Sequence, residues 1–469
     1  MSKIILLGMN QEEDKEGIVS QNESCEFIGI EYLRAYAQQK GIKVKVKHPP
    51  QDLQKIISEK PEIVGFSVMT SNYEPSRKFS KELKDKNPNT KIIWGGVHST
   101  TCNEEVLKEG SVDYVVLGEG EKTFSELVKR IQKDENTSNL EGLAFYNGKE
   151  IIENPMPKRL TSEELDSIDP KALHQLEDYS IFFAKQMPHS IPESEMNFAM
   201  ISGSRGCWNN CSFCSSNSMW GRNIQYRSPK NIVNELEHLV NEKGVNFVFF
   251  SDDDFLVNGR WAESITQEVI NRGIDVNIHA MASVRSSSKF NNYDLLKKAG
   301  IKELTIGMET TSQKLIDQMG KGYDLNLLPS VANEITSHGI HLGLYYMLGY
   351  PGQTKKELDT DYEFIKKIPF SRIRAVFATP YPGTALYNKV NNENLWLEGY
   401  QDNWSTFTND RPVIKTPATP EELINARKKV LSLYHSQDYV TRMKKMYQGD
   451  AQSKRAFDEF QDFLSGAIK

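Results

Sequence analysis

The strongest constraint on the fold is a regular alternation of short apolar runs and longer amphipathic stretches over residues 1–132. The apolar runs are as long as buried β-strands and lie at 4–7, 44–46, 63–68, 91–94 and 114–117. The stretches with helical spacing lie near 27–40, 51–59, 74–86, 103–109 and 121–132. Strands that alternate with helices pair in parallel, so this region is predicted to form a doubly wound, Rossmann-like sheet.

Small and polar residues follow four of these strands. Sheets of this type bind ligands at the carboxyl ends of their strands, so the four ends are predicted to form one binding edge. The candidate residues are Gly8, Met9, Asn10, Ser67, Val68, Met69, Thr70, Gly95, Gly96, Val97, His98, Gly118, Glu119 and Gly120. Glycines also form ordinary turns, and a single Gly-Gly pair is weak evidence, but four such loops at one edge are stronger evidence.

Three cysteines, Cys207, Cys211 and Cys214, lie within eight residues with the spacing C-x3-C-x2-C. A cubane iron–sulfur cluster normally takes four thiolates, and the remaining cysteines, Cys25 and Cys102, are far away in the sequence. Three ligands would leave one iron open for chemistry. A structural zinc site would need a fourth ligand, and an odd number of cysteines in a chain this long disfavours a disulfide framework.

The triplet, with Phe213 at its aromatic position, resembles the signature of the radical S-adenosylmethionine (SAM) superfamily. The resemblance implies a 4Fe-4S cluster held by the three cysteines, with SAM chelated to the open iron through its amino and carboxylate groups. In that family, one electron from the reduced cluster cleaves SAM into methionine and a 5′-deoxyadenosyl radical, which abstracts a hydrogen atom from the substrate.

Residues 196–390 continue the strand–helix alternation and suit the six-unit partial barrel of that superfamily. The expected strands lie at 197–202, 246–250, 275–281, 303–307, 341–348 and 374–378. Active residues of a parallel barrel lie at the carboxyl ends of its strands. The resemblance implies SAM-binding residues at these strand ends and in the cysteine motif, and the expected set is Phe213, Asp252, Asp253, Ser283, Arg285, Glu309, Gly349, Tyr350 and Phe377.

The resemblance gives several of these residues specific roles. Asp252 or Asp253 is expected near the SAM amino group, although adjacent acids can also cap a helix. Arg285 is suited to binding the SAM carboxylate through two hydrogen bonds, although an arginine after a strand is often a surface residue. Glu309 is expected to accept hydrogen bonds from the ribose hydroxyls, and the loop that begins at Gly349 is expected near the adenine.

The phrases at 95–98 and 113–121 resemble the cobalamin-binding domain that precedes many radical SAM cores. The resemblance implies cobalamin as a third cofactor. The chain has no Asp-x-His motif of the kind that supplies a cobalt ligand in other cobalamin proteins, so His98 is expected to line the corrin pocket rather than to bind cobalt. The alternative is a Rossmann-like sheet that has lost its ligand, since this fold hosts many functions.

Two segments carry no chemical motif. Residues 133–195 hold an apolar hairpin around an Asn-Gly turn and a polar, proline-containing stretch, and they are expected to link the two units. Residues 391–469 begin with Trp396, Tyr400, Trp404 and Phe407 and become charged and helical. These aromatic residues are expected to pack a small helical cap, with contact to the substrate as the alternative. The expected domains are therefore 1–132, 133–195, 196–390 and 391–469.

Composition and charge indicate which partners and which cellular compartment to expect. The net charge is −6 with both signs well mixed, which disfavours nucleic acid as a partner. The first apolar run is too short for a signal peptide or a membrane span, and an oxygen-labile cluster favours the reducing cytoplasm. A flavodoxin or ferredoxin is the usual kind of reductase for such a cluster.

The function predicted from these features is cobalamin-dependent methylation of an unactivated carbon in a small-molecule or peptide substrate. The first alternative keeps the cofactors but performs cyclisation or ring rearrangement. A methylthiotransferase would need three further cysteines in the N-terminal region, where only Cys25 and Cys102 occur. A non-catalytic cobalamin or cluster sensor would have no need for the strand-end motifs around the cysteines.

Overall fold

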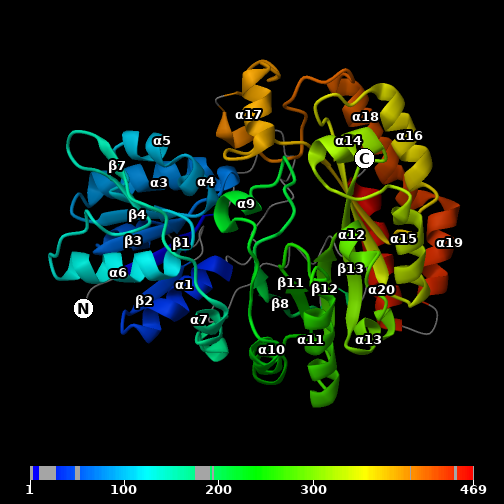
Figure 1. Cartoon of the computed structure of the whole chain (residues 1–469), viewed down its shortest axis with the longest axis horizontal. Helices are drawn as coiled ribbons and strands as arrows, with labels where there is room; N and C mark the ends of the chain where they lie inside the picture. Colours follow the sequence, from blue (N-terminus) through cyan, green and yellow to red (C-terminus); the bar gives the residue numbers. More distant parts are fainter. Residues whose placement is uncertain are drawn as a thin grey trace.

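The computed structural model describes residues 4–9, 28–47, 53–174, 191–192, 195–401, 403–447 and 451–467, and the candidate residue Asn10 and the cysteine Cys25 lie outside these ranges. Figure 1 shows two α/β units side by side, the first on the left and the second on the right, with the short helix α9 (Ser216–Trp220) between them. No helix in the described ranges combines the length and the apolar character that crossing a bilayer requires.

The first unit is built on a sheet that, within the described residues, has seven strands. Their spatial order is β2 (Val44–Lys47), β1 (Ile4–Gly8), β3 (Ile63–Ser67), β4 (Lys91–Gly95), β5 (Tyr114–Val116), β6 (Leu143–Tyr146) and β7 (Ile151–Glu153). The first five are parallel, which confirms the expected architecture. One face packs on α1 (Ile28–Gln39) and α6 (Gly120–Gln132), and the other on α2 (Leu53–Ser58), α3 (Tyr73–Lys86) and α5 (Asn103–Lys108).

Two local features of this unit differ from the sequence-based expectation. The hairpin expected in the linker pairs antiparallel with β5, with Val115 opposite Ala144, so the sheet continues to Glu153. The loop after β4 turns at once into a short helix, α4 (Val97–Thr101). Gly96 permits this turn because its φ is +94°, and a Cβ there would lie 2.7 Å from the Val68 carbonyl oxygen.

The second unit is a partial barrel, with six parallel strands in sequence order in the part of the chain that the structure describes. They are β8 (Phe198–Ile201), β11 (Phe247–Phe250), β12 (Asn277–Ala282), β13 (Ile301–Glu309), β14 (His341–Leu348) and β15 (Arg372–Phe377). The helices outside the sheet are α10 (Pro229–Lys243), α11 (Gly259–Arg272), α13 (Tyr293–Lys298), α15 (Leu327–Ser337) and α16 (Lys355–Ile365). Two short strands, β9 (Ser204–Arg205) and β10 (Gln225–Tyr226), follow β8 and form a separate pair.

A buried polar group closes the amino-terminal end of this barrel. Arg372, at the start of β15, donates from Nε to Glu303 Oε1 at 3.0 Å and from Nη2 to Thr305 Oγ1 at 2.9 Å. Both partners come from β13, so the guanidinium reaches across β14 inside the sheet. The carboxyl ends of the strands are left to form the functional site, as in other parallel barrels.

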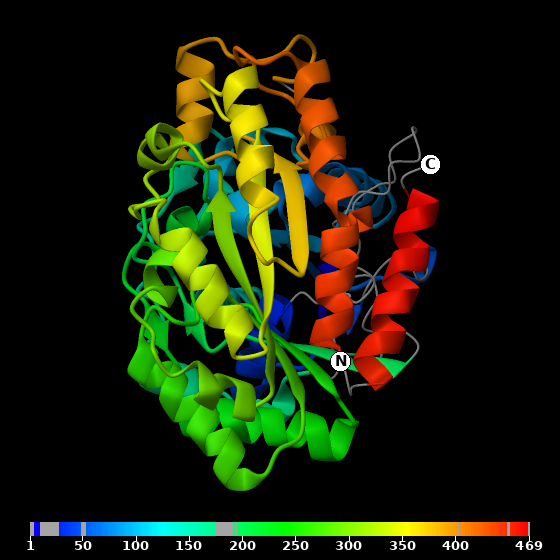
Figure 2. The same cartoon turned by 90° about the vertical axis from the view of Figure 1, so that its right-hand side faces the viewer.

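The C-terminal region divides into two parts. Helix α18 (Pro420–Leu431) packs beside α16, and α19 (Gln437–Met446) and α20 (Ala451–Ala467) continue the cover along the edge of the barrel (Figure 2). The segment between α17 (Ala385–Asn392) and α18 instead crosses to the first unit, where Trp404 Nε1 donates to Glu105 Oε1 at 2.8 Å. The aromatic rings of this segment therefore belong to a hydrophobic core that both units share.

Candidate cofactor sites

The cluster loop, residues 206–215, carries the three candidate cysteines at the carboxyl end of the barrel. Two backbone hydrogen bonds fix Ser212 at its centre: its N–H donates to the Met319 carbonyl at 2.8 Å, and its carbonyl accepts from Leu386 N–H at 2.7 Å. Burial raises the pKa of Cys207 to about 11 and that of Cys214 to about 12. A metal ligand must be a thiolate, so binding of a cluster here would release the thiol protons and offset the cost of the buried charge.

Two of the adjacent aspartates have different surroundings. Asp252 is fully buried behind the loop, where it accepts hydrogen bonds from Gly203 N–H at 3.1 Å and from the Ser204 hydroxyl. Burial raises the pKa of Asp252 to about 6. Asp253 is exposed, accepts from Ser216 Oγ at 2.5 Å and adds to the pKa rise of Cys214. Asp253 is therefore the acid that lies beside the thiols.

Glu309 ends strand β13 in an unusual conformation. Its φ is +66°, and the strand register shifts between Gly307 and Glu309. The buried ammonium of Lys321 donates to Glu309 Oε1 at 2.9 Å. Residues other than glycine rarely adopt this φ, and such strain concentrates at functional sites.

The sequence-based set of site residues did not include Lys321. Burial lowers the pKa of Lys321, but the carboxylate of Glu309 outweighs this effect, so the pKa lies above its ordinary value and the side chain is charged. The same ammonium lies 5.9 Å from the centroid of the Phe213 ring on the cluster loop. Only the fold shows that the turn at residues 319–322 brings a buried cation to the cluster loop.

Arg285 and Ser283 lie at the end of β12, on the other side of the cluster loop. The Arg285 guanidinium stacks 4.0 Å from the centroid of the Trp208 ring, next to Cys207. Ser283 Oγ accepts from Ser286 N–H at 3.0 Å and caps the short helix α12 (Val284–Ser287). Arg285 therefore contacts the cluster loop through an aromatic ring, and Ser283 has a structural partner.

The last candidate SAM residues differ in their orientation. Tyr350 is buried, and its hydroxyl lies 2.8 Å from Ser212 Oγ, which links the loop after β14 to the cluster loop. Gly349 has φ +78°, and its N–H donates to Gln353 Oε1 at 2.6 Å. Phe377 faces outward into the core between the sheet and the helices, where the centroid of its ring lies 5.4 Å from Arg427 Cζ. The structure thus brings Tyr350 to the cluster loop but not Phe377.

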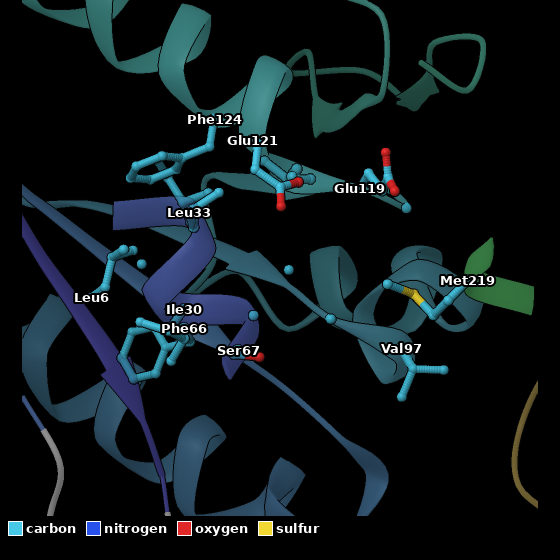
Figure 3. A pocket seen from close by; sticks show the side chains of 18 of the residues that line it. Leu6, Ile30, Leu33, Phe66, Ser67, Val97, Glu119, Glu121, Phe124 and Met219 are labelled. Carbon is cyan, nitrogen blue, oxygen red and sulfur yellow. The ribbon is translucent and has the colours of Figure 1, made fainter. Parts of the chain in front are cut away.

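A cavity of about 240 Å³ lies in the first unit, between the sheet and helices α1 and α6 (Figure 3). The candidate residues that line it are Ser67, Met69, Gly95, Gly96, Val97, Gly118, Glu119 and Gly120. Its deeper wall is formed by apolar residues of the strands and helices, such as Leu6, Ile93 and Phe124, and three residues of the second unit, Arg205, Met219 and Trp220, also line it. Complete small-molecule pockets usually measure about 300–1,000 Å³, so this cavity fits one part of a larger cofactor.

Other candidates for cobalamin binding do not line this cavity. His98 is buried against α3, with Nδ1 3.1 Å from Thr70 Oγ1 and its ring centroid 4.5 Å from that of Tyr73. Burial lowers the pKa of His98 to about 3, so the ring is neutral. Gly8, Met9, Val68 and Thr70 are likewise not among the lining residues. Sequence position alone does not tell which residues of a strand end face the ligand, because neighbours in a turn point in different directions.

Comparisons with known proteins agree with this arrangement. Residues 17–128 match the B12 binding domain family, and residues 201–365 match the radical SAM superfamily. A protein of Pyrococcus horikoshii named as an uncharacterized methyltransferase is 30% identical over 393 residues, which span 82% of this chain and 81% of that protein. The anaerobic magnesium-protoporphyrin IX monomethyl ester cyclase of Cereibacter sphaeroides is 27% identical over 347 residues, which span 72% of this chain and 55% of the cyclase.

A solved structure shows the same fold over the full length of the chain. It is the radical S-adenosylmethionine methyltransferase TsrM from Kitasatospora setae with cobalamin and a [4Fe-4S] cluster bound, which matches with a TM-score of 0.72 at 16% identity and covers 100% of both chains. The two family matches fall on the unit that contains the cavity and on the unit that contains the cluster loop. The chain therefore belongs to the cobalamin-dependent radical SAM enzymes, whose cofactors are a 4Fe-4S cluster, SAM and cobalamin.

Proposed function

We propose that the protein is a methyltransferase that acts on an unactivated carbon of a small-molecule or peptide substrate. The observation that carries this proposal is the position of α9, which follows the cluster loop directly. Its first residue, Ser216, contacts Asp253 beside the thiols, and its last two, Met219 and Trp220, line the cavity of the first unit. One short helix therefore connects the two cofactor sites, and a substrate between them would meet both.

When bound, the cluster and SAM supply a 5′-deoxyadenosyl radical, and cobalamin supplies the methyl group. The chain itself binds and orients these groups and keeps water away. Cys207, Cys211 and Cys214 would hold the cluster. Among the residues near it, Lys321 is suited to the SAM carboxylate and Asp253 to the SAM amino group, because each offers the opposite charge.

Glu309 is the proposed partner of the ribose hydroxyls. Its Oε1 atom is already bonded to Lys321, which fixes the direction of the carboxylate. A fixed carboxylate can accept two hydroxyl groups in a defined geometry without reorganising on binding. The strained backbone at Glu309 fits this role, because strain of this kind persists where the surroundings hold a functional group in place.

For cobalamin, we propose that the cavity receives the nucleotide tail and that the corrin ring covers the rim. The apolar wall suits an aromatic base, and the cavity is too small for the whole cofactor. Met69 on the rim is 39% exposed, and Met156, which lies against Gly118, is 50% exposed. Large apolar side chains that gather at a rim mark a surface that a ligand covers.

The substrate is proposed to lie inside the barrel, above the polar group around Arg372. At this level the inward positions Met281, Tyr345 and Arg374 are partly exposed, whereas their neighbours along each strand are buried. The Tyr345 hydroxyl lies 3.9 Å from Met281 Sδ, so these two side chains face the same space. A one-electron reductase such as a flavodoxin or ferredoxin is the proposed electron donor, and nucleic acid is not a proposed partner.

A second reaction class follows from the likeness to the cyclase. Cyclisation or ring rearrangement would use the same three cofactors and the same cavity, so binding data do not separate it from methylation. The product does, because only methyl transfer adds one carbon and its hydrogens to the substrate.

The test is product analysis under anaerobic conditions. The reconstituted enzyme is incubated with reductant, SAM that carries a deuterated methyl group, and a small-molecule and peptide extract of the source cells. Methylation predicts a product that gains a fully or largely deuterated methyl group and formation of 5′-deoxyadenosine. A product of unchanged carbon number, with 5′-deoxyadenosine formed, would instead establish cyclisation or rearrangement.

A further inference from the structure

Arg205 ends the short strand β9 just before the cluster loop, two residues before Cys207, and its side chain reaches into the first unit. It is only 7% exposed. Its Nη2 atom donates to Glu121 Oε1 at 2.7 Å, and its Nη1 atom donates to Glu119 Oε1 at 3.2 Å. Both carboxylates belong to the first unit and line the cavity there. A single guanidinium thus connects the cobalamin side of the protein to the cluster side.

Two aromatic rings hold the same guanidinium. Its Cζ atom lies 4.7 Å from the centroid of the Tyr32 ring, on α1, and 5.4 Å from that of Trp220, at the end of α9. A cation over an aromatic face is stabilised electrostatically, and more strongly when water is excluded. Because Trp220 also lines the cavity, a cofactor bound there would touch one of the two rings that hold Arg205.

Glu119 extends the connection to the segment between the units. Its Oε2 atom accepts from Leu160 N–H at 2.6 Å, and its Oε1 atom lies 3.5 Å from Arg159 Nε. Arg159 in turn donates from Nη1 to the Trp220 carbonyl at 2.6 Å and from Nη2 to the Arg205 carbonyl at 3.0 Å. Two carboxylates and two guanidinium groups therefore form one network around the mouth of the cavity.

The backbone after Arg205 leads directly to Cys207, the first of the three cysteines. Gly206 follows with φ +101°, and a Cβ there would lie 3.0 Å from the Asn223 carbonyl oxygen. On its other side, Arg205 follows Ser204, which Asp252 holds. The short link from Arg205 through Gly206 to Cys207 is therefore confined on both sides, and a change at Arg205 would reach the cluster ligand.

We propose that Arg205 is a positioning residue that couples occupancy of the cobalamin cavity to the geometry of the cluster loop and so to the affinity for SAM. The inference rests on the proposed placement of cobalamin in the cavity. A cofactor over Glu119, Glu121 and Trp220 would contact three of the side chains that hold Arg205, and so restrict the positions that the guanidinium can take. The tightened network holds Cys207 in the position that the SAM-bound cluster needs.

This coupling is reciprocal, because linkage requires that each ligand change the affinity of the other by the same factor. Cobalamin is therefore expected to tighten SAM binding, and SAM is expected to tighten cobalamin binding equally. Typical coupling between two sites amounts to about 5-fold to 150-fold. We expect a factor of at least about 5-fold here.

The experiment measures binding and not turnover. SAM affinity is measured by equilibrium dialysis on protein with an oxidised cluster, which does not cleave SAM, with and without hydroxocobalamin. The affinity for hydroxocobalamin is measured by its absorption, with and without SAM. Arg205→Met is expected to bring both ratios close to one, and Glu121→Gln, which removes one of the two carboxylate partners, is expected to lower both ratios partially.

Arg272→Met is the matched control. Arg272 also pairs with two carboxylates, Glu237 at 2.9 Å and Glu268 at 2.8 Å, but it lies between α10 and α11, outside both cofactor sites. Its ratios should equal those of the unchanged protein. The electron paramagnetic resonance signal of the reduced cluster gives a second readout, which should shift on addition of cobalamin in the control but not in Arg205→Met.

Each outcome decides the inference. Ratios of one in the unchanged protein, with cobalamin bound, overturn the coupling and leave the proposed function standing. If the unchanged protein binds no cobalamin, both the coupling and the proposed function are overturned. If Arg205→Met does not fold, Glu121→Gln decides the matter, because ratios equal to those of the unchanged protein would overturn the role of the network.

Discussion

Lys321 and Glu309 form a buried ion pair beside the cluster loop, with Lys321 Nζ 2.9 Å from Glu309 Oε1. Neither group could be buried alone without a large cost, since an unpaired buried charge is strongly destabilising. Gly307 makes room for the pair, because a Cβ there would lie 2.5 Å from Glu309 Oε1 and 2.6 Å from Lys321 Nζ. The pair is therefore built into the end of β13, beside the cluster loop.

Lys321→Met should weaken SAM binding while the cluster stays intact. The change removes the proposed partner of the SAM carboxylate and the group that orients Glu309. A lost hydrogen bond to a charged group costs about 1.5–3 kcal/mol, which corresponds to about 10-fold to 160-fold in the dissociation constant. Equilibrium dialysis of the protein with an oxidised cluster measures the dissociation constant for SAM. Lys86→Met, which breaks the exposed pair with Glu82, is the control, and equal affinities in both variants would contradict the assignment.

Asp252→Asn should change how stability depends on pH. Burial raises the pKa of Asp252 to about 6, above the ordinary value of 3.8. The folded protein therefore holds a proton that the unfolded chain has released, so the free energy of unfolding falls as pH rises from about 4 to about 6. The loss amounts to about 3 kcal/mol, at 1.36 kcal/mol for each unit of pKa shift. Urea unfolding of the cofactor-free protein across this range should show a shallower fall in the variant, and identical slopes would contradict the burial of a titrating carboxyl.

Gly96→Ala should lower the cobalamin content of the protein. The φ of Gly96 is +94°, and a Cβ would meet the Val68 carbonyl oxygen at 2.7 Å, so the turn from β4 into α4 must shift. Gly148→Ala is the matched control, because Gly148 has the same φ of +94° but no atom within 4 Å of the added Cβ. Corrin absorption per chain should fall in the first variant only. An equal corrin content in both would show that the rim does not need this turn.

Trp404→Ala should loosen the contact between the two units. Trp404 is 8% exposed, and its ring centroid lies 5.2 Å from that of His98. Removal of a buried tryptophan side chain costs about 3–5 kcal/mol. The urea midpoint should fall, and the linker should become more sensitive to limited proteolysis. Tyr146→Ala, at a side chain that is 57% exposed, should change neither. An unaltered protease pattern in Trp404→Ala would show that other contacts hold the units together.

Regular elements could be predicted from the sequence because their periodicity is local. The strand expected at 341–348 is found with the same bounds, and the five parallel strands of the first sheet lie within two residues of their expected ends. The hairpin β6–β7 was expected in the linker instead. Its Asn-Gly turn identified a hairpin, but nothing local in the sequence shows that β6 pairs with the free edge of β5.

The candidate site was harder to predict because its residues meet across long stretches of chain. Lys321 reaches Glu309 only through the turn after α14 (Gln313–Met319), and Arg205, Met219 and Trp220 reach the cavity only because the two units pack together. Glu121, one residue beyond the expected Gly118–Gly120 set, lines the cavity as well. Its position at the first turn of α6, next to three expected residues, was the one signal that could have found it.

The most direct test of the central claim is the cofactor content of the protein. The protein is purified without oxygen, reconstituted with iron, sulfide and hydroxocobalamin, and assayed for iron, sulfide and corrin on one sample. The account predicts about four irons and one corrin per chain. It also predicts that replacement of Cys207, Cys211 and Cys214 by Ala removes the iron and leaves the corrin, while Cys25→Ala and Cys102→Ala change neither. A chain that binds the cluster without corrin, or that keeps its iron after loss of the three cysteines, would contradict the account.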